Sequence, residues 1–275
     1  MITIVELIYL EETPKFLLIN KQDPEAAHKA MEFYQGQYEI GSKLDEILKE
    51  HEEEAKISFC RGFIQMIKVP HQRKAFIIGI LALQIIAGIW SITFLSSDLF
   101  MAYFDSELAQ YASFIFMVAD FIACIIGNVI SEKFTRRVLL LSSAIGNTIC
   151  LLGYVVFDRL AFYVYDSLKY LSVISIVLYG ITYGIGVGPI SYFITSEITS
   201  QQHRALIQSM VFAVNTLSGF VLGLVTLPAY NWIGVWSFLP LYIIPSILCI
   251  IYLYYNLPET KGREIADILR DMKRK

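Results

Sequence analysis

The sequence predicts an all-α integral membrane protein, a six-transmembrane-helix bundle with a short helical cytosolic segment. Composition is the first reason: 56% of the 275 residues are hydrophobic and 17% are charged, against ~25% charged in an average soluble domain. The mean hydropathy of +0.55 agrees. Distribution is the second reason, because charged residues concentrate in the first 70 positions and long apolar runs follow.

Six membrane spans are predicted from five apolar runs. A span needs about 20 mostly apolar residues. The runs are 75–97, 108–131, 138–157, 170–196 and 205–258. Only the second run holds a charge, Asp120. The last run has 54 residues, which is too long for one helix and right for two. Pro228, Asn231 and Gly234 predict the turn between these two helices.

The loops between the runs alternate in charge. Basic residues precede the first run, follow the second, separate the fourth from the fifth and follow the sixth, whereas the other loops are acidic, mixed or uncharged. The positive-inside rule therefore places the 11–74 segment and the C-terminus in the cytoplasm. The six-helix bundle then covers 71–258 and a cytosolic tail covers 259–275. We expect the plasma membrane as its location.

The N-terminal 70 residues are predicted as two parts. Residues 1–10 are apolar but too short to span, and they lack the basic region and cleavage site of a signal peptide. We interpret them as the stub of a truncated transmembrane helix. Residues 11–70 predict amphipathic cytosolic linker helices lying against the membrane domain, one of them capped by Asp23 with Pro24 at its first position. A solvated linker is the alternative.

Three other classes of protein are excluded by composition and motifs. Four cysteines, three of them within apolar runs, are too few for a secreted disulfide scaffold. A net charge of −3 argues against nucleic-acid binding. No H-E-x-x-H motif occurs and all four histidines lie outside the apolar runs, so we expect no enzyme, no metal and no cofactor.

Three stretches carry specific motifs. They are PETKGR at 258–263, SEKFTRR at 131–137, and GPISYFITSE at 188–197 followed by Arg204. Together they resemble the sugar porter family of the major facilitator superfamily, whose patterns include PETKGR, E-x-x-G-R-R and G-P-x-x-[WY]-x-x-x-x-E. Two further matches are ETPKFLL at 12–18, similar to PESPRFLL, and QIIAGI at 84–89, similar to QQLSGIN.

The resemblance covers essentially the whole chain but only the second half of the family's twelve-helix fold. It implies that the six spans match helices seven to twelve and that 11–70 matches the intracellular helical linker. It further implies transport of a hexose-like sugar or polyol by alternating access, working against a missing N-terminal six-helix half, in cis or in trans, within the lipid bilayer. A non-transporting half-bundle, regulatory or vestigial, and a transporter of a different small polar solute are the alternatives.

Glycines interrupt the first and fourth runs. Transporters built from repeats form midplane sites on helices broken at corresponding positions. Gly88 in the first run, and Gly188 with Pro189 in the fourth, are therefore predicted as broken-helix or gating residues. The alternative is that the glycines only allow close helix packing. The resemblance adds Phe94, which stands where the family has a tyrosine of the outer gate.

Four residues are predicted by the resemblance to bind substrate. Gln84 matches the first Gln of QQLSGIN, and Asn215 matches an amide of the eleventh helix. Tyr192 stands where the family usually has Trp, and Asp120 where it usually has Asn. Four polar or aromatic groups on four spans predict a midplane pocket.

Several other polar positions of the family are lost in this chain. Ile85, Trp90, Gly184 and Gly219 replace hydrogen-bonding residues, so a smaller or less polar solute is an alternative to hexose. A mid-span carboxylate such as Asp120 usually faces a bundle interior. Substrate binding, proton coupling and a packed, protonated state are its three interpretations. The family's coupling carboxylate lies in the first helix, so the sequence leaves proton coupling undecided.

The spacing of six charged residues predicts a cytosolic charge network. They are Glu132, Arg136, Arg137, Glu197, Arg204 and Glu259. In the family such residues tie the bundle to the linker helices when the transporter is closed on the inside. The alternative is that these charges only set the topology.

Overall fold

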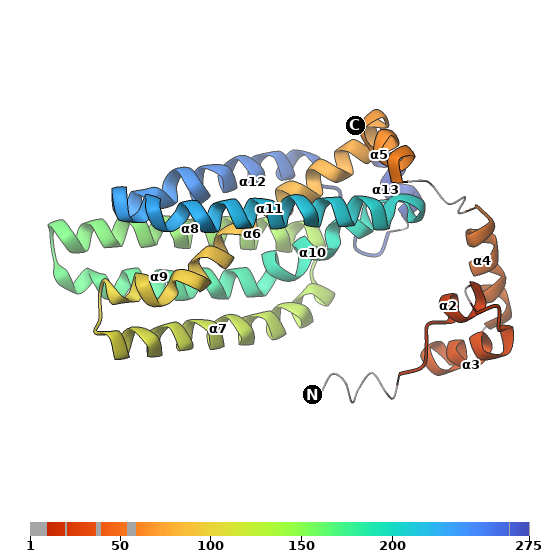
Figure 1. Cartoon of the computed structure of the whole chain (residues 1–275), viewed down its shortest axis with the longest axis horizontal. Coiled ribbons are helices and arrows are strands. Elements are labelled where there is room, and N and C mark those ends of the chain that lie inside the picture. Colours follow the sequence, from red (N-terminus) through yellow and green to blue (C-terminus); the bar gives the residue numbers. More distant parts are fainter. Residues whose placement is uncertain (1–9, 20, 37–39, 54–58, 264, 275) are drawn as a thin grey trace. The chain divides into compact units, whose positions relative to one another are not determined.

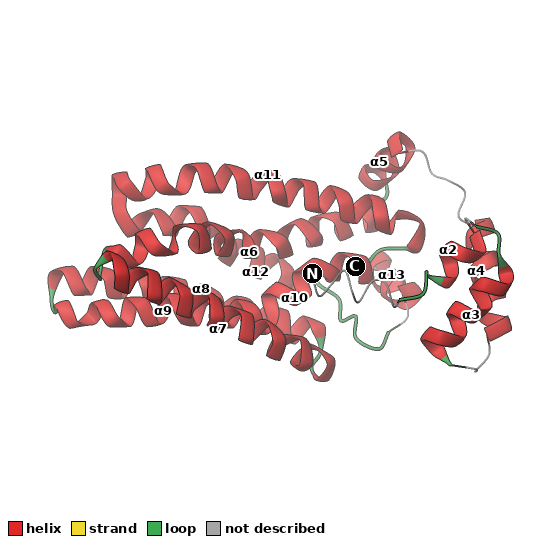
Figure 2. Cartoon of the chain, turned by 60° about the horizontal axis from the view of Figure 1, so that its bottom comes forward, coloured by secondary structure: helices red, strands yellow, loops and turns green. Residues whose placement is uncertain are grey.

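The computed structural model describes residues 10–19, 21–36, 40–53, 59–263 and 265–274. All elements in these ranges are helices joined by loops (Figure 2). The chain divides into two compact units, Met1–Ser58 and Phe59–Lys275, whereas the sequence places the boundary at residue 70. The predicted helix stub at 1–10 lies, except for Leu10, outside the described residues.

The described residues of the first unit form three short helices. They are α2 (Pro14–Ile19), α3 (Pro24–Gln35) and α4 (Ile40–Glu53). The predicted start of α3 is confirmed, because the Asp23 carboxylate accepts the Ala26 N–H at 3.0 Å and Pro24 begins the helix. Helix α3 ends at Gln35 and is followed by the capping residue Gly36, whose φ of 75° favours glycine. A small core holds this unit together, formed by Leu17, Leu18, Ala27 and Ala30.

The second unit contains the six predicted spans, and the prediction of six membrane-length helical segments is confirmed. The long helices run along one common direction (Figure 1). In chain order the elements are α5 (Phe59–Lys68), α6 (Pro70–Met101), α7 (Ser106–Lys133), α8 (Arg136–Tyr163), η1 (Asp166–Leu168), α9 (Lys169–Thr182), η2 (Tyr183–Val187), α10 (Gly188–Glu197), α11 (Gln201–Ile233), η3 (Gly234–Ser237), η4 (Leu239–Ile243), α12 (Ile244–Asn256) and α13 (Ile265–Arg274).

Helix α6 is the central helix of the second unit. It packs against α7, α10, α11 and α12, and 67% of its most apolar stretch is buried, against 11% for α11. The outer helices expose rows of large apolar side chains, such as Phe114, Phe121 and Ile125 on α7. Exposed apolar rows of this kind suit a lipid environment.

The turn between the fifth and sixth spans differs from the prediction. Helix α11 continues through Pro228 and Asn231 to Ile233, and the chain turns only at Gly234, with a φ of 64°. A proline inside a helix removes one backbone hydrogen bond, which membrane helices tolerate. The assignment of the turn to Pro228 and Asn231 was therefore wrong, whereas Gly234 was right.

Two spans contain a wide π turn directly before a proline. In the fourth span the Gly188 N–H donates to the Tyr183 carbonyl, five residues earlier, and Pro189 follows. In the sixth span the Ile244 N–H donates to the Leu239 carbonyl, and Pro245 follows. Because proline has no N–H and its ring crowds the preceding turn, the wider turn relieves the helix at that point.

Candidate functional site

A cavity of about 740 Å³ opens on the face formed by α6, α10 and α11. Its residues are Trp90, Ser91, Phe94, Tyr192, Phe212, Asn215, Thr216, Gly219, Phe220, Gly223 and Leu224. The volume lies in the ~300–1,000 Å³ range of small-molecule sites. The cavity is open on one side, where the side chain of Phe94 is 80% exposed and that of Phe220 is 63% exposed.

Helix α11 supplies most of the cavity wall. Phe212, Asn215, Gly219 and Gly223 recur at intervals of three or four residues, which places them on one face of the helix. A Cβ built on either Gly219 or Gly223 would meet no described atom within 4 Å apart from the adjacent residues and nearby backbone of its own helix. The two glycines therefore keep the middle of this face hollow, and the amide of Asn215 lies at the edge of the hollow.

Two of the four predicted substrate-binding residues line the cavity, Tyr192 and Asn215. The Tyr192 ring packs against Phe212 with ring centroids 6.0 Å apart. The Gln208 amide donates to the Tyr192 carbonyl at 2.7 Å, which ties α10 to α11 beside the cavity.

Gln84 lies next to the cavity rather than in its wall. Its side-chain oxygen accepts the Ser218 hydroxyl at 2.9 Å, so it joins α6 to α11 one residue before Gly219. The structure thus connects Gln84 to the cavity through the helix that forms most of the wall.

Asp120 is outside the cavity wall. It is half-buried on α7, where its backbone carbonyl packs against Gly184 of η2. Cys124 lies one turn away, with its sulfur 4.0 Å from the carboxylate. No lysine, arginine or histidine among the described residues forms an ion pair with Asp120. The structure therefore does not bring all four predicted residues into one pocket.

The glycines of the first span mark close packing instead of a break. Helix α6 runs as one α-helix from Pro70 to Met101 through Gly79 and Gly88. A Cβ on Gly88 would lie 2.7 Å from the Tyr179 hydroxyl and 3.1 Å from the Tyr242 ring. The prediction of a break at Gly88 was therefore wrong, because the absent side chain makes room for two tyrosines.

The fourth span is interrupted where the sequence predicted an interruption. The π turn lies at Tyr183–Val187, directly before Gly188 and Pro189. Gly188 packs against the Tyr183 ring, and Gly184 packs against the backbone of α7 at Asp120. The interruption and the close packing therefore occur together in this span.

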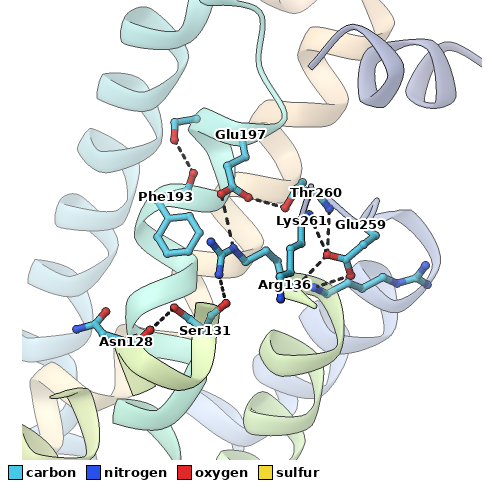
Figure 3. A network of polar contacts seen from close by, with 10 residues as sticks. Asn128, Ser131, Arg136, Phe193, Glu197, Glu259, Thr260 and Lys261 are labelled. Carbon is cyan, nitrogen blue, oxygen red and sulfur yellow. Dashed lines mark hydrogen bonds and ion pairs between the residues drawn. The ribbon is translucent and has the colours of Figure 1, made fainter. Parts of the chain in front are cut away.

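A polar network joins the ends of α7, α8 and α10 to the segment that follows α12 (Figure 3). The Glu259 carboxylate accepts the backbone N–H groups of Arg136 at 2.9 Å and Arg137 at 3.2 Å, which caps the N-terminus of α8. An anion there also interacts favourably with the helix dipole. Glu259 accepts the N–H of Lys261 as well, at 3.1 Å.

Arg136 is the centre of this network. Its guanidinium lies 3.7 Å from the Glu197 carboxylate, donates to the Ser131 carbonyl, and sits 5.1 Å from the centre of the Phe193 ring. The Thr260 hydroxyl donates to the other oxygen of Glu197 (Figure 3). The ends of α7, α8 and α10 and the segment after α12 are thereby held together.

The structure brings together four of the six predicted network residues, Arg136, Arg137, Glu197 and Glu259. Glu132 is exposed and forms no hydrogen bond or ion pair with any described residue. The Nε of Arg204 is buried without a hydrogen-bond partner among those residues. Their inclusion in the network was wrong, because sequence spacing places charges at one membrane end without specifying where each side chain points.

Some site residues escaped the sequence analysis. Thr260 and Lys261 belong to the network through contacts that spacing does not reveal. The cavity wall also includes Phe212, Thr216 and Phe220. A pattern in the sequence could have identified these three residues. Polar, aromatic and glycine residues recur on one face of α11, whereas a purely lipid-facing helix would present only apolar residues there.

Fold and cavity together define an integral membrane protein whose helix bundle carries a site of ligand size. Among the described residues, no three His, Cys, Asp or Glu side chains are placed to hold a metal ion. Comparison with known proteins then specifies the class. The family model described as "Sugar (and other) transporter" matches residues 1–271, so the chain belongs to this family of the major facilitator superfamily, whose members are transporters rather than enzymes.

Curated relatives agree with this assignment. The chain is 29% identical over 275 residues to solute carrier family 2, facilitated glucose transporter member 7, of Mus musculus. This alignment covers 97% of this chain and 52% of the relative. It is 27% identical over 270 residues to member 3 of Oryctolagus cuniculus, with 96% and 53% covered. The chain spans about half the length of the curated relatives it matches.

Solved structures show the same fold. A double Trp mutant of XylE superposes with a TM-score of 0.76 at 16% identity, covering 98% of this chain and 56% of the other. The proton:xylose symporter XylE bound to 6-bromo-6-deoxy-D-glucose gives a TM-score of 0.73 at 16% identity, with the same coverage. The second unit thus has the fold of about half of such a transporter.

Proposed function

We propose that this chain provides the second six-helix half of a sugar transporter and binds a sugar-like solute in the cavity between α6, α10 and α11. The observation that carries the proposal is the open, ligand-sized cavity lined by Tyr192 and Asn215. Membership of the sugar transporter family supports the choice of substrate class. The relatives named as glucose transporters and the structure with a bound glucose derivative support it further.

The chemistry of the cavity wall suits a solute with both polar and apolar faces. The amide of Asn215 and the hydroxyls of Ser91 and Thr216 offer donors and acceptors for ring hydroxyls. The indole of Trp90 offers a flat apolar surface for the C–H face of a sugar ring. Most of the remaining wall is apolar, which favours a solute with fewer hydroxyls than hexose, such as a deoxysugar or a small polyol.

A second helical bundle is needed to close the cavity. The open side presents Trp90, 47% exposed, together with Phe94 and the polar face of α11 around Asn215. An amide left facing lipid would be costly, so we place a facing six-helix half there, whether in the same chain or as a separate one. Rocking of the two halves around the solute would alternate access between the two sides.

The network around Arg136 is the proposed inner latch of this motion. We assign its end of the bundle to the cytoplasm, together with the 11–74 segment and the C-terminus, from the positive-inside rule, and the membrane to the plasma membrane. A network that forms in one state and opens in the other biases a two-state equilibrium by its differential free energy. Glu197 and Arg136 are the side chains best placed to do so.

The test is uptake of labelled hexose, deoxysugar and polyol in transporter-deficient cells. The chain is expressed alone and together with the N-terminal half of a related transporter. We expect uptake only when a facing half is present. Asn215→Ala should then lower uptake efficiency about two- to twelvefold, which corresponds to the loss of one hydrogen bond of about 0.5–1.5 kcal/mol. Asn231→Ala, at the exposed end of the same helix, is the matched control.

The outcomes separate the competing functions. Equal effects of Asn215→Ala and Asn231→Ala would show that the cavity does not bind the solute. Absence of uptake in every combination, despite confirmed surface expression, would favour a non-transporting half-bundle with a regulatory role or none. Proton coupling is tested in the same cells by imposing a pH gradient on the wild type and on Asp120→Asn, which restores the amide usual in the family.

A further inference from the structure

The hydroxyl of Ser91 joins the cavity between α6, α10 and α11 to the sixth span. Ser91 lines this cavity from α6 with only 3% of its surface exposed. Its hydroxyl forms a hydrogen bond with the phenol of Tyr242 in η4, a residue that is 4% exposed and is not part of the cavity wall. Gly88 makes room for this phenol, because a Cβ there would lie 3.1 Å from the Tyr242 ring.

The Tyr242 phenol has a second partner on α11. It forms a hydrogen bond with the hydroxyl of Thr226, a residue that is 1% exposed. The Thr226 hydroxyl also donates to the Leu222 carbonyl, one turn earlier on the same helix, at 2.5 Å. Three buried hydroxyl groups from three different spans therefore form a chain that ends on a backbone carbonyl.

The direction of each hydrogen bond in this chain follows from the number of protons. A hydroxyl has one proton to donate, and its oxygen can also accept, whereas a carbonyl only accepts. Thr226 donates its proton to Leu222, so Tyr242 must be the donor toward Thr226. Tyr242 has then used its only proton, so Ser91 must be the donor toward Tyr242.

Turning the chain around would leave buried groups without partners. If Ser91 directed its proton into the cavity, the bond to Tyr242 would break unless the Tyr242 proton left Thr226 in turn. A buried polar group that loses its partner retains the free-energy cost of its desolvation. Consecutive hydrogen bonds in a medium of low dielectric constant also strengthen one another. The Ser91 oxygen therefore offers lone pairs, and no proton, to the cavity.

We propose that Ser91 accepts a hydrogen bond from a hydroxyl group of the solute, and that Tyr242 and Thr226 are positioning residues that fix Ser91 as an acceptor. This inference rests on the proposed binding of a sugar-like solute in the cavity and adds a rule of selectivity to it. A solute hydroxyl that donates toward Ser91 is favoured. A group that can only accept, such as a fluorine at the same ring position, meets the Ser91 lone pairs and is disfavoured.

The experiment measures inhibition of uptake of labelled 6-deoxy-D-glucose in transporter-deficient cells that express the chain with the facing half of a related transporter. The competitors are D-glucose and its mono-deoxy and mono-deoxyfluoro analogues. At the ring position that contacts Ser91, the deoxy analogue should inhibit about two- to twelvefold less strongly than D-glucose, the range for one hydrogen bond. The deoxyfluoro analogue should be weaker still. Ser91→Ala identifies the position, because it should abolish these differences at one ring position only.

Two variants test the positioning residues. In Tyr242→Phe the Ser91 proton becomes free to turn into the cavity, so the deoxyfluoro analogue should inhibit at least as strongly as the deoxy analogue. Thr226→Val removes the acceptor of the Tyr242 proton, which can then turn to Ser91, and the same inversion is expected. The matched control is Tyr255→Phe, since Tyr255 is 68% exposed on the same span as Tyr242. It should keep the wild-type order. Wild-type order in both positioning variants, or equal weakening of all analogues, would overturn the proposal.

A measurement without solute separates failure of this inference from failure of the proposed function. Thermal unfolding of the purified chain in detergent compares Ser91→Ala, Tyr242→Phe and the double variant. Both changes remove the same hydrogen bond, so the double variant should melt little below the less stable single variant. Additive losses would overturn the hydroxyl chain even in a chain that transports sugar. Non-additive losses without any uptake would support the chain and overturn the contact with the solute, together with the proposed function.

Discussion

Gly127 on α7 is the position where one added methyl group should damage the bundle most clearly. A Cβ built there would overlap the carbonyl oxygen of Gly184 in the π turn and lie 2.6 Å from that of Ile185. An ordinary C···O approach is about 3.3 Å or more, so α7 and η2 would have to separate by at least about 0.7 Å. Both obstacles are backbone atoms, which cannot rotate out of the way as a side chain can.

The magnitude of this effect follows from two opposing contributions. Overpacking costs about 1–3 kcal/mol, and rigid neighbours place Gly127→Ala at the upper end of that range. The higher helix propensity of alanine stabilises the folded state by up to about 1 kcal/mol relative to glycine. We therefore expect a net loss of about 2 kcal/mol. Gly146→Ala on α8 is the matched control, because its Cβ would lie at an ordinary 3.4 Å from the Thr182 methyl group and gain only the propensity contribution.

Thermal unfolding of the purified chain in detergent, followed by tryptophan fluorescence, measures the difference. At about 2–4 °C for each kcal/mol in a chain of this length, Gly127→Ala should melt roughly 6 °C or more below Gly146→Ala. Equal melting temperatures for the two variants would refute close backbone packing as the reason for glycine at 127. A higher melting temperature for Gly127→Ala would do so even more directly.

Two further predictions concern the two ends of the bundle. Glu259→Ala should lower the stability by about 1–2 kcal/mol, as loss of a helix cap does. Glu132 is exposed and has no partner among the residues that the structure describes, so Glu132→Ala should change the stability by less than about 0.5 kcal/mol. Comparable losses of the two variants in thermal unfolding would contradict the capping role of Glu259. In the α6–α7 loop, burial and the hydrogen bond to Asp158 raise the pKa of the Tyr103 phenol. Its stabilising contribution is fully present below the unfolded value of about 10 and is lost as the pH rises above it. Tyr103→Phe should therefore destabilise the chain at pH 7 and lose less stability than the wild type from pH 9 to 11, measured by denaturant unfolding; parallel pH profiles would disprove the contribution of this phenol.

Hydropathy predicts the membrane spans well because length and apolarity are properties of the chain itself. The run 75–97 lies inside α6, and 170–196 follows α9, η2 and α10 almost to their ends. The capping of α3 by Asp23 was predictable for the same reason, since cap and helix are neighbours in sequence. Such features need no knowledge of what packs against them.

Tertiary neighbours decide the features that the sequence left open. Gly88 belongs to an unbroken helix because Tyr179 and Tyr242 fill the space beside it, and neither partner is identifiable from the spacing of glycines. Pro228 stays within α11 because the membrane offers no water to compete for the helical backbone. Asp120 lies apart from Asn215 because each faces a different neighbour of the bundle, which position in a span does not specify.

The π turn at Tyr183–Val187 fixes the rotational phase of everything after it in the fourth span. It accommodates one extra residue, and one residue corresponds to about 100° of rotation around a helix axis. If the turn tightened to a regular α-helix, the Tyr192 ring would rotate by about that angle away from Phe212 and the cavity. A single helical wheel drawn through this span is therefore correct for only one of its two halves, because the other half is rotated by about 100°. Pro189 favours the wide turn and thereby helps to keep the Tyr192 ring directed toward Phe212 and the cavity.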